Sequence, residues 1–218
     1  GRRVLLVDLD AQACATFSLG LDPEDLPTGM ADVLLADAAV REVVRPTGDG
    51  IDVLAATPAL GAADHALAST VGREHAVSRA LAPLASDYDW IVIDCAPALG
   101  ILTVGALVCA DGVIVPVQCE TLSHRGVGQL FETIADVQRL VLGILPTAYD
   151  GRTAHARAVL ADLPERYGVP VLAPITRSIR FAEAPATGRT ILATASSSRG
   201  AQEYRAVAAW LDQEPSFG

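Results

Sequence analysis

Short aliphatic runs that end in a polar or acidic residue recur along the chain. RVLLVDL at 3–9 is followed by Asp10, WIVID at 90–94 ends in Asp94, and GVIVPV at 112–117 is a further run of the same kind. Such runs are typical of strands that are buried on both faces of a parallel sheet. The pattern therefore predicts an α/β protein with aspartates at the carboxyl edge of its sheet, where ligands bind.

Helical periodicity and turn residues fill the intervals between these runs. The segment between 94 and 112 is long enough for a crossover helix, and strand–helix–strand crossovers are nearly always right-handed and parallel. We expect one doubly wound, mostly parallel twisted sheet flanked by helices, in a single domain over residues 1–218. Further strands are predicted at 51–55 and 141–146, and helices at 30–35, 74–84, 126–140, 154–167 and 200–211, followed by a frayed tail.

Composition and charge restrict the class of protein. A hydrophobic fraction of 51% with only 5% aromatic residues predicts a core of Ala, Val, Leu and Ile. A net charge of −10 argues against general adhesion to nucleic acid or anionic lipid, so any DNA contact needs a local arginine patch. The cysteines are scattered and no targeting segment is evident, which predicts a cytoplasmic protein without a structural metal. These cysteines are Cys14, Cys95, Cys109 and Cys119.

Two of the predicted strands end in aspartate, with Asp8 and Asp10 at the first and Asp94 at the other. The carboxyl ends of parallel strands meet at one edge of the sheet, so these carboxylates are expected at the same rim. A phosphoryl-transfer site needs one carboxylate to hold hydrated magnesium and another to orient the attacking water. Strand-end aspartates also cap the helices that follow them, and spacing alone leaves both interpretations open.

Six blocks of sequence carry a specific resemblance. They follow one another in the order and spacing of the blocks of the ParA family of partition ATPases, and they cover nearly the whole chain. The chain therefore resembles a ParA-type ATPase of the deviant P-loop superfamily. The blocks are VLLVDLDAQ (4–12), DYDWIVIDCAPALGILT (87–103), VIVPVQCE (113–120), GILPTAYDGRT (143–153), ITRSIRFAEAP (175–185) and SSSRGAQEY (196–204).

This resemblance implies a function and a set of partners. It implies a cytoplasmic, nucleoid-associated ATPase that binds ATP and Mg²⁺, forms a homodimer on ATP binding, and then binds DNA non-specifically. Hydrolysis would be stimulated by a ParB-type centromere-binding protein and would release the DNA, with no part played by a membrane. Related ATPases segregate both plasmids and chromosomes with the same motifs.

Individual residues are carried over by their place in these blocks. The resemblance implies that Asp10 is the catalytic residue that positions the hydrolytic water, and that Asp94 holds magnesium through water. It implies DNA contacts for Arg152 in DGRT and Arg180 in SIRF, because the family uses arginine there to touch phosphate. The implied nucleotide-binding residues are Asp8, Gln12, Pro97, Thr147, Ile175 and Arg177.

The sequence departs from the family pattern at the phosphate site. The family places a strand, a lysine-containing glycine-rich loop and a helix before RRVLLVD, and Gly1 begins just after that unit would end. The 218 residues contain no lysine and no GxxxxGK pattern, so they offer no such cradle for phosphates. We expect an N-terminally incomplete P-loop NTPase-like fold that is inactive by itself, with exposed strand edges where an inner strand would pair.

Other classes of protein fit less of the sequence. A receiver domain needs a lysine, and a dinucleotide-binding enzyme needs GxGxxG before the acid. A MinD-type membrane ATPase ends in a basic amphipathic helix, whereas WLDQEPSFG is acidic. The remaining alternative is a degenerate, non-catalytic ParA-shaped adaptor that binds a partner or DNA without nucleotide turnover. Magnesium-dependent ATP affinity separates this adaptor from the ATPase.

Overall fold

A computed structural model describes residues 1–119 and 123–214 of the chain. The chain divides into two compact units. The first contains residues 1–109 together with residues 184–190, and the second contains the rest of the described residues. Each unit is described by itself below, and the single domain expected from the sequence stays a prediction.

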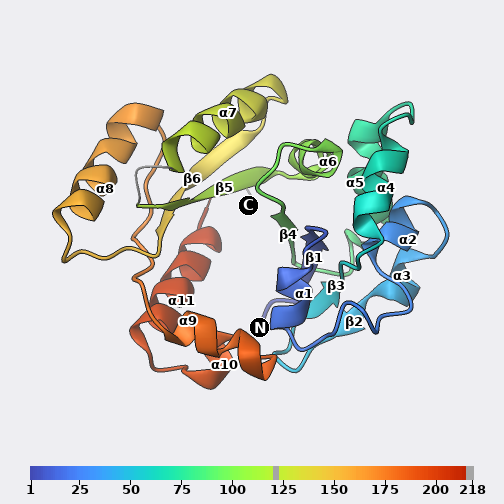
Figure 1. The fold of residues 1–218 in the computed structure, drawn as a ribbon, viewed down its shortest axis with the longest axis horizontal. Coiled ribbons are helices and arrows are strands. Elements are labelled where there is room, and N and C mark those ends of the chain that lie inside the picture. Colours follow the sequence, from blue (N-terminus) through green and yellow to red (C-terminus); the bar gives the residue numbers. More distant parts are fainter. Residues whose placement is uncertain (120–122, 215–218) are drawn as a thin grey trace. The chain divides into compact units, whose positions relative to one another are not determined.

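The first unit is built on a four-stranded sheet in the order β2-β3-β1-β4 (Figure 1). β1 runs parallel to β3 and to β4, and β2 pairs antiparallel with β3. The strands are β1 (Val4–Leu9), β2 (Arg45–Pro46), β3 (Asp52–Leu54) and β4 (Trp90–Cys95). The helices are α1 (Cys14–Ser18), α2 (Met30–Leu34), α3 (Val40–Val43), α4 (Leu60–Leu67), α5 (Ala76–Leu81) and α6 (Ile101–Cys109), with 3-10 turns at Arg73–His75, Ala82–Leu84 and Pro185–Thr187.

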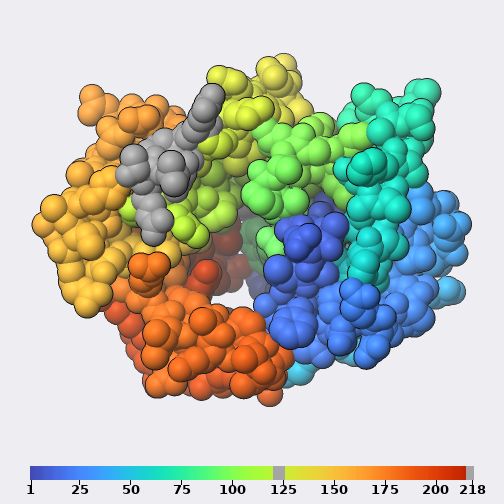
Figure 2. Space-filling view, viewed as in Figure 1, coloured from blue at the N-terminus to red at the C-terminus, as the bar shows by residue number. Residues whose placement is uncertain are grey.

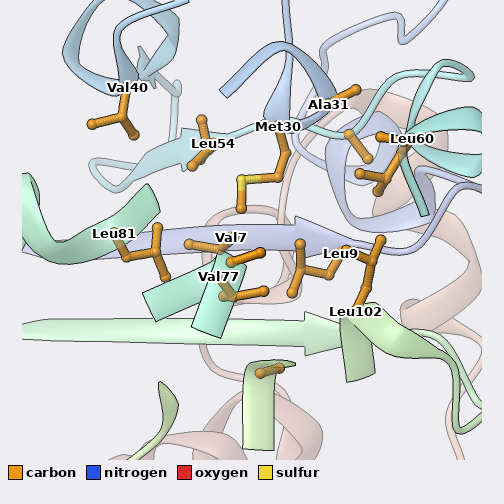
Figure 3. Close-up of a cluster of buried hydrophobic side chains, with 14 of the residues drawn as sticks. Val7, Leu9, Met30, Ala31, Val40, Leu54, Leu60, Val77, Leu81 and Leu102 are labelled. Carbon is orange, nitrogen blue, oxygen red and sulfur yellow. The ribbon is translucent and has the colours of Figure 1, made fainter. Parts of the chain in front are cut away.

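Alternate side chains of β1 point into the hydrophobic core of the first unit. Leu5, Val7 and Leu9 are at most 2% exposed, and they belong to one buried cluster with residues of α2, α4, α5 and α6. Figure 3 shows the side chain of Met30 extending from α2 toward Val7. Burying one side chain of this size is worth about 1.5–3 kcal/mol. This cluster therefore fixes which face of β1 points inward, and it places Asp8 on the other face.

A segment from late in the chain, residues 184–190, is fastened to the first unit. Gly188 meets Gly20 backbone to backbone, since a Cβ on Gly188 would lie 2.7 Å from the Cα of Gly20, and both glycines have positive φ. Asp49 accepts a hydrogen bond from Thr190 N at 2.6 Å, and it forms an ion pair with the guanidinium of Arg189. Burial acts to raise the pKa of Asp49, but these hydrogen bonds outweigh it and lower the pKa.

The second unit contains a two-stranded parallel sheet of β5 (Gly112–Gln118) and β6 (Leu140–Thr147) (Figure 1). Its helix α8 has clear end signals: the Thr153 hydroxyl accepts a hydrogen bond from Ala156 N, and Gly168 ends the helix in a left-handed conformation. No helix in the described ranges of the chain is both long and apolar enough to cross a membrane. The helices of this unit are α7 (Ser123–Asp136), α8 (Ala154–Tyr167), α9 (Arg180–Glu183), α10 (Ile191–Thr194) and α11 (Arg199–Leu211).

The predicted fold class is confirmed, with one correction in detail. The protein is α/β with mainly parallel strands flanked by helices. Within the described residues, backbone hydrogen bonds join these strands into a four-stranded and a two-stranded sheet. The helix predicted at 126–140 ends at Asp136, because Gln138 is left-handed with φ 55° and β6 begins at Leu140. Part of the predicted frayed tail, residues 215–218, lies outside the described residues.

Each sheet ends in an open edge strand, as expected from the sequence. Among the residues that the structure describes, β4 pairs with β1 alone and β5 pairs with β6 alone. Val92, in the middle of β4, is 47% exposed. An edge strand of this kind is able to pair with a further strand.

We expect Gly143→Ala to destabilise the second unit by about 1–3 kcal/mol, because a Cβ there would lie 2.3 Å from Leu172 Cδ1 and 3.0 Å from the carbonyl oxygen of Pro170. Gly128→Ala in α7 is the matched control, since its Cβ meets no atom within 4 Å and alanine favours helix. Urea unfolding of both variants measures the difference. Equal stabilities for the two variants would show that Leu172 and the backbone at Pro170 move aside at no cost in stability.

Candidate functional site

Asp8 is buried at the carboxyl end of β1, where three donors hold its carboxylate. The residue is 0% exposed. Its Oδ2 accepts hydrogen bonds from Thr16 N at 2.8 Å and Thr16 Oγ1 at 2.7 Å, and its Oδ1 accepts from Asp10 N at 3.1 Å. The Thr16 hydroxyl accepts in turn from Ala56 N at 3.0 Å. Asp8 therefore caps α1 and ties the end of β1 to the residues that follow β3.

The loop after β1 is a tight turn with a strained residue at its end. The Asp10 carbonyl accepts a hydrogen bond from Ala13 N at 2.9 Å, and Asp10 Oδ1 accepts from Gln12 N at 2.9 Å. Ala13 is left-handed with φ 52°, which costs a non-glycine residue on the order of 1 kcal/mol. Asp10 is half-buried and Gln12 is exposed. Both predicted site residues therefore stay accessible at the sheet edge.

Asp94 lies on β4 directly beside Asp8 on β1. The strand register pairs these two residues, and neighbouring strands lie about 4.8 Å apart. Asp94 is exposed, as is Pro97 in the loop after β4. Desolvation by the surrounding protein, together with the negative charges of Asp8 and Asp10, raises the pKa of Asp94. The structure thus brings the three aspartates together at one end of the sheet.

These three carboxylates form a negative site that lacks a counterion within the described part of the chain. None of the ion pairs found there involves Asp8, Asp10 or Asp94. No group of three or more His, Cys, Asp or Glu side chains among those residues could hold a metal ion by itself. A cation would relieve the repulsion that raises the pKa of Asp94. The site suits hydrated Mg²⁺, which takes one or two carboxylates and keeps several waters.

The second unit brings together the later predicted residues Thr147, Ile175 and Arg177. Beyond the end of β6, Tyr149 forms a parallel bridge with Thr176. Ile175 N donates a hydrogen bond to the carbonyl of the residue before Thr147 at 2.8 Å, and Arg177 N donates to the Tyr149 carbonyl at 2.9 Å. Ile175 is 2% exposed, whereas Thr147 is half-buried and Arg177 is exposed. The Ile175 side chain therefore anchors this segment in the core.

Arg152 and Arg180 are exposed, and each is paired with an acidic residue. The Arg152 side chain is 90% exposed and binds Asp150 through two parallel hydrogen bonds of 2.8 and 2.7 Å. These bonds lower the pKa of Asp150 to about 2. Arg180 donates to Glu183 Oε2 at 3.0 Å. A phosphate group that binds either guanidinium must therefore compete with a carboxylate already in place.

Three residues that shape these regions are not indicated by the sequence motifs. Thr16 completes the Asp8 network, Ala13 takes the strained position in the turn, and Glu203 accepts two hydrogen bonds from Thr176. The signal for Thr16 is a hydroxyl residue in the first turn after a strand-end aspartate. Glu203 lies in the block SSSRGAQEY, but only the structure reveals its partner. Nothing in the sequence marks Ala13, because alanine is unremarkable in a helix start.

Comparisons with known sequences identify relatives along most of the chain. A family model described as an AAA domain matches residues 1–144. The sporulation initiation inhibitor protein Soj of Bacillus subtilis is 38% identical over 212 residues, which cover 94% of this chain and 84% of that protein. The chromosome-partitioning ATPase Soj of Thermus thermophilus is 42% identical over 215 residues, covering 95% of this chain and 82% of that protein.

A comparison with solved structures finds the same fold with a nucleotide present. The structure of a cobyrinic acid a,c-diamide synthase from Mycobacterium smegmatis, with bound ATP analog and magnesium, superimposes with a TM-score of 0.85. Its sequence is 47% identical to this one, and the match covers 97% of this chain and 82% of that chain.

We expect Thr16→Val to lower the free energy of unfolding by about 2–4 kcal/mol. The substitution keeps the shape but removes one donor from the buried Asp8 carboxylate and the acceptor of Ala56 N. Thr16→Ser is the control, because it keeps the hydroxyl and loses only a methyl group, worth about 0.8 kcal/mol. Denaturant unfolding compares the two, and a Thr16→Val variant as stable as Thr16→Ser would contradict the network.

We expect Asp94→Asn to raise the melting temperature at pH 7. In the folded protein, desolvation and the charges of Asp8 and Asp10 raise the pKa of Asp94, so its charged form is disfavoured on folding. The gain should shrink as the pH falls below the ordinary Asp value of 3.8, because Asp94 of the wild-type protein is then protonated in both the folded and the unfolded state. Thermal melts across this range test the sign. A gain that is the same at every pH would point to a cause other than charge.

Proposed function

Because the chain belongs to the ParA family of nucleotide-switched ATPases, we propose that it hydrolyses ATP in the segregation of DNA. Relatives named for chromosome partitioning support this role. They include the Thermus protein and the chromosome partitioning protein ParA of Myxococcus xanthus, which is 36% identical over 214 residues. The fold agrees, since this chain shares the P-loop NTPase architecture of the nucleotide-bound Mycobacterium structure.

One observation carries the proposal for this chain itself: Asp94 stands beside Asp8 at the carboxyl end of a parallel sheet, with Asp10 in the adjoining turn. Asp10 and Asp94 keep accessible oxygens and have no cationic partner in the described residues. When bound, Mg²⁺ would screen the charge of the ATP phosphates. Asp94 would hold the hydrated ion through water, and Asp10 would orient the attacking water.

In this account Asp8 acts on the site from inside the protein. It has no exposed surface, so the direct nucleotide contact expected from the sequence gives way to a positioning role. Its hydrogen bonds from Thr16 and from Asp10 N fix where the Asp10 turn begins. Gln12 and Pro97 are exposed on the two loops beside the aspartates, where they would flank the nucleotide.

Within the second unit, Thr147, Ile175 and Arg177 remain predicted nucleotide-binding residues. Backbone hydrogen bonds join the two segments that carry them. Arg152 and Arg180 would exchange their acidic partners for DNA phosphates. With a net charge of −10, binding to DNA would depend on individual exposed arginines such as these.

The proposed cycle also includes ATP-dependent dimerisation, action at the nucleoid, and hydrolysis stimulated by a ParB-type partner. It needs donors for the ATP phosphates, and the printed sequence contains no lysine and no GxxxxGK pattern. Assays of the activity therefore use the polypeptide encoded by the whole reading frame, with the 218-residue chain beside it. ATP binding that neither polypeptide shows would favour the non-catalytic adaptor.

A second candidate is the activity named for the Mycobacterium structure. That protein is called a cobyrinic acid a,c-diamide synthase, and at 47% it has the higher identity to this chain. That structure holds an ATP analog and magnesium, so nucleotide binding does not separate the two candidates. ATP consumption that depends on cobyrinic acid would favour the synthase, whereas consumption that depends on DNA and a partner protein would favour partition.

We expect Asp10→Asn to reduce ATP turnover by at least about 10²-fold while ATP-dependent DNA binding is retained. Asparagine keeps the Oδ1 acceptor for Gln12 N, so the turn is preserved while the charge that orients water is lost. Phosphate release in the presence of DNA and a ParB-type protein measures turnover, and fluorescence anisotropy measures DNA binding.

The control for this experiment is Asp10→Ala, which removes both the charge and the turn hydrogen bond. If only Asp10→Ala lost turnover, the role of Asp10 would be structural. If both variants kept turnover, the assignment of Asp10 as the catalytic residue would be wrong. A wild-type protein that binds neither ATP nor DNA would overturn the proposed function.

A further inference from the structure

The carboxylate of Glu203 on α11 accepts two hydrogen bonds from Thr176, in the segment that precedes α9. Thr176 N donates a hydrogen bond to Glu203 Oε2 at 2.8 Å, and Thr176 Oγ1 donates to Oε1 at 2.6 Å. The Glu203 side chain is only 15% exposed, and Arg199, one turn earlier, donates to Oε1 at 2.7 Å. Burial acts to raise the pKa of Glu203, but the hydrogen bonds from Thr176 and Arg199 outweigh it. The Glu203 carboxylate is therefore charged at neutral pH.

The same helix also contacts α9 itself, through Phe181. Phe181 packs edge to face on Tyr204, with ring centroids 5.7 Å apart and an interplanar angle of 78°. It also lies so close to Gly200 that a Cβ there would meet Phe181 Cζ at 2.6 Å. Such an aromatic pair is worth about 0.5–1.5 kcal/mol beyond the area it buries. α11 thus fixes the segment at Thr176 and again at Phe181.

The residues between these two attachments face outward. Arg177 and Arg180 are exposed, and Ile179 is 73% exposed. Ser178 accepts a hydrogen bond from Arg180 N, which starts the short helix α9. The segment around α9, orange in Figure 2, lies at the surface in that view. Residues 177–180 therefore form an arginine-bearing bridge, which we call the arginine bridge, held at both ends by α11.

We propose that Glu203 is a positioning residue for the DNA contacts of the arginine bridge. This inference rests on the proposed function, because it assumes that Arg180 meets DNA phosphate. A bridge fixed at both ends loses little conformational freedom on binding, whereas a loose one must be ordered at a cost in affinity. The two hydrogen bonds from Thr176 to Glu203 are the polar half of that attachment. Through them, the Glu203 carboxylate orients the backbone that leads into Arg177.

The sign of the effect separates positioning from simple charge. If the acidic residue acts only through its electrostatic field, removing it from a DNA-binding surface strengthens DNA binding, because the phosphates are repelled less. Glu203→Ala also frees Arg199 from its ion pair. Electrostatics alone therefore predicts tighter DNA binding for Glu203→Ala, whereas loss of the hydrogen bonds from Thr176 predicts weaker binding.

Glu183→Ala is the matched control, because it makes the same change in charge, on the helix that carries Arg180. Glu183 pairs with Arg180 at 3.0 Å and is exposed, but it makes no bond to Thr176. Thr176→Val is the neutral partner variant, since it removes the hydroxyl donor without changing charge. Arg180→Glu serves as the reference for a lost phosphate contact.

The test measures ATP-dependent DNA affinity by anisotropy, at several salt concentrations, on the whole-reading-frame protein. We expect affinity to fall about three- to tenfold in Glu203→Ala and by less in Thr176→Val, while Glu183→Ala binds as tightly as wild type or more tightly. In Glu203→Ala, the slope of DNA affinity against salt concentration should fall toward the slope in Arg180→Glu. The expected decrease is about that of one lost phosphate contact.

Each outcome decides the inference. Unchanged or tighter binding in a folded Glu203→Ala variant would overturn it, with the proposed function left intact. If Glu203→Ala melts too early to assay, Thr176→Val decides, and wild-type affinity in that variant would likewise overturn it. A wild-type protein that shows no ATP-dependent DNA binding would remove the proposed function and this inference together.

Discussion

The candidate site depends on one buried carboxylate. Asp8 ends β1 inside the protein, and its three hydrogen bonds hold the start of the Asp10 turn, the first turn of α1 and, through the Thr16 hydroxyl, the residues after β3. A buried carboxylate without such donors would be strongly destabilising. Because the network is satisfied, Asp10 and Asp94 can stay accessible while the backbone beneath them is fixed.

Negative charge is concentrated at this end of the sheet at a cost to stability. The raised pKa of Asp94 reports that cost, since the charged form is opposed by desolvation and by the neighbouring carboxylates. Functional sites often keep such unfavourable features because a ligand relieves them. In the second unit, by contrast, Arg152 and Arg180 are already paired with acidic residues, and the arginine bridge is held by α11.

Much of the fold could be predicted from the sequence, because several of its strands and helices have clear local sequence patterns. β1, β4 and β5 are aliphatic runs, and α8 has a threonine cap and a glycine stop. The order of the strands within the four-stranded sheet could not be predicted, since strand pairing depends on residues far apart in the chain. Asp10 and Asp94 followed from family motifs, whereas the roles of Thr16 and Glu203 depend on partners 8 and 27 residues away.

Calorimetry of ATP binding shows whether the three aspartates form the magnesium side of an ATP site. ATP is titrated into the whole-reading-frame protein with Mg²⁺ and, separately, with chelator. We expect ATP to bind only when Mg²⁺ is present, and we expect this binding to be lost in Asp94→Ala. Equal binding with and without Mg²⁺, or no binding under either condition, would contradict this expectation and would leave a ParA-shaped protein without nucleotide turnover.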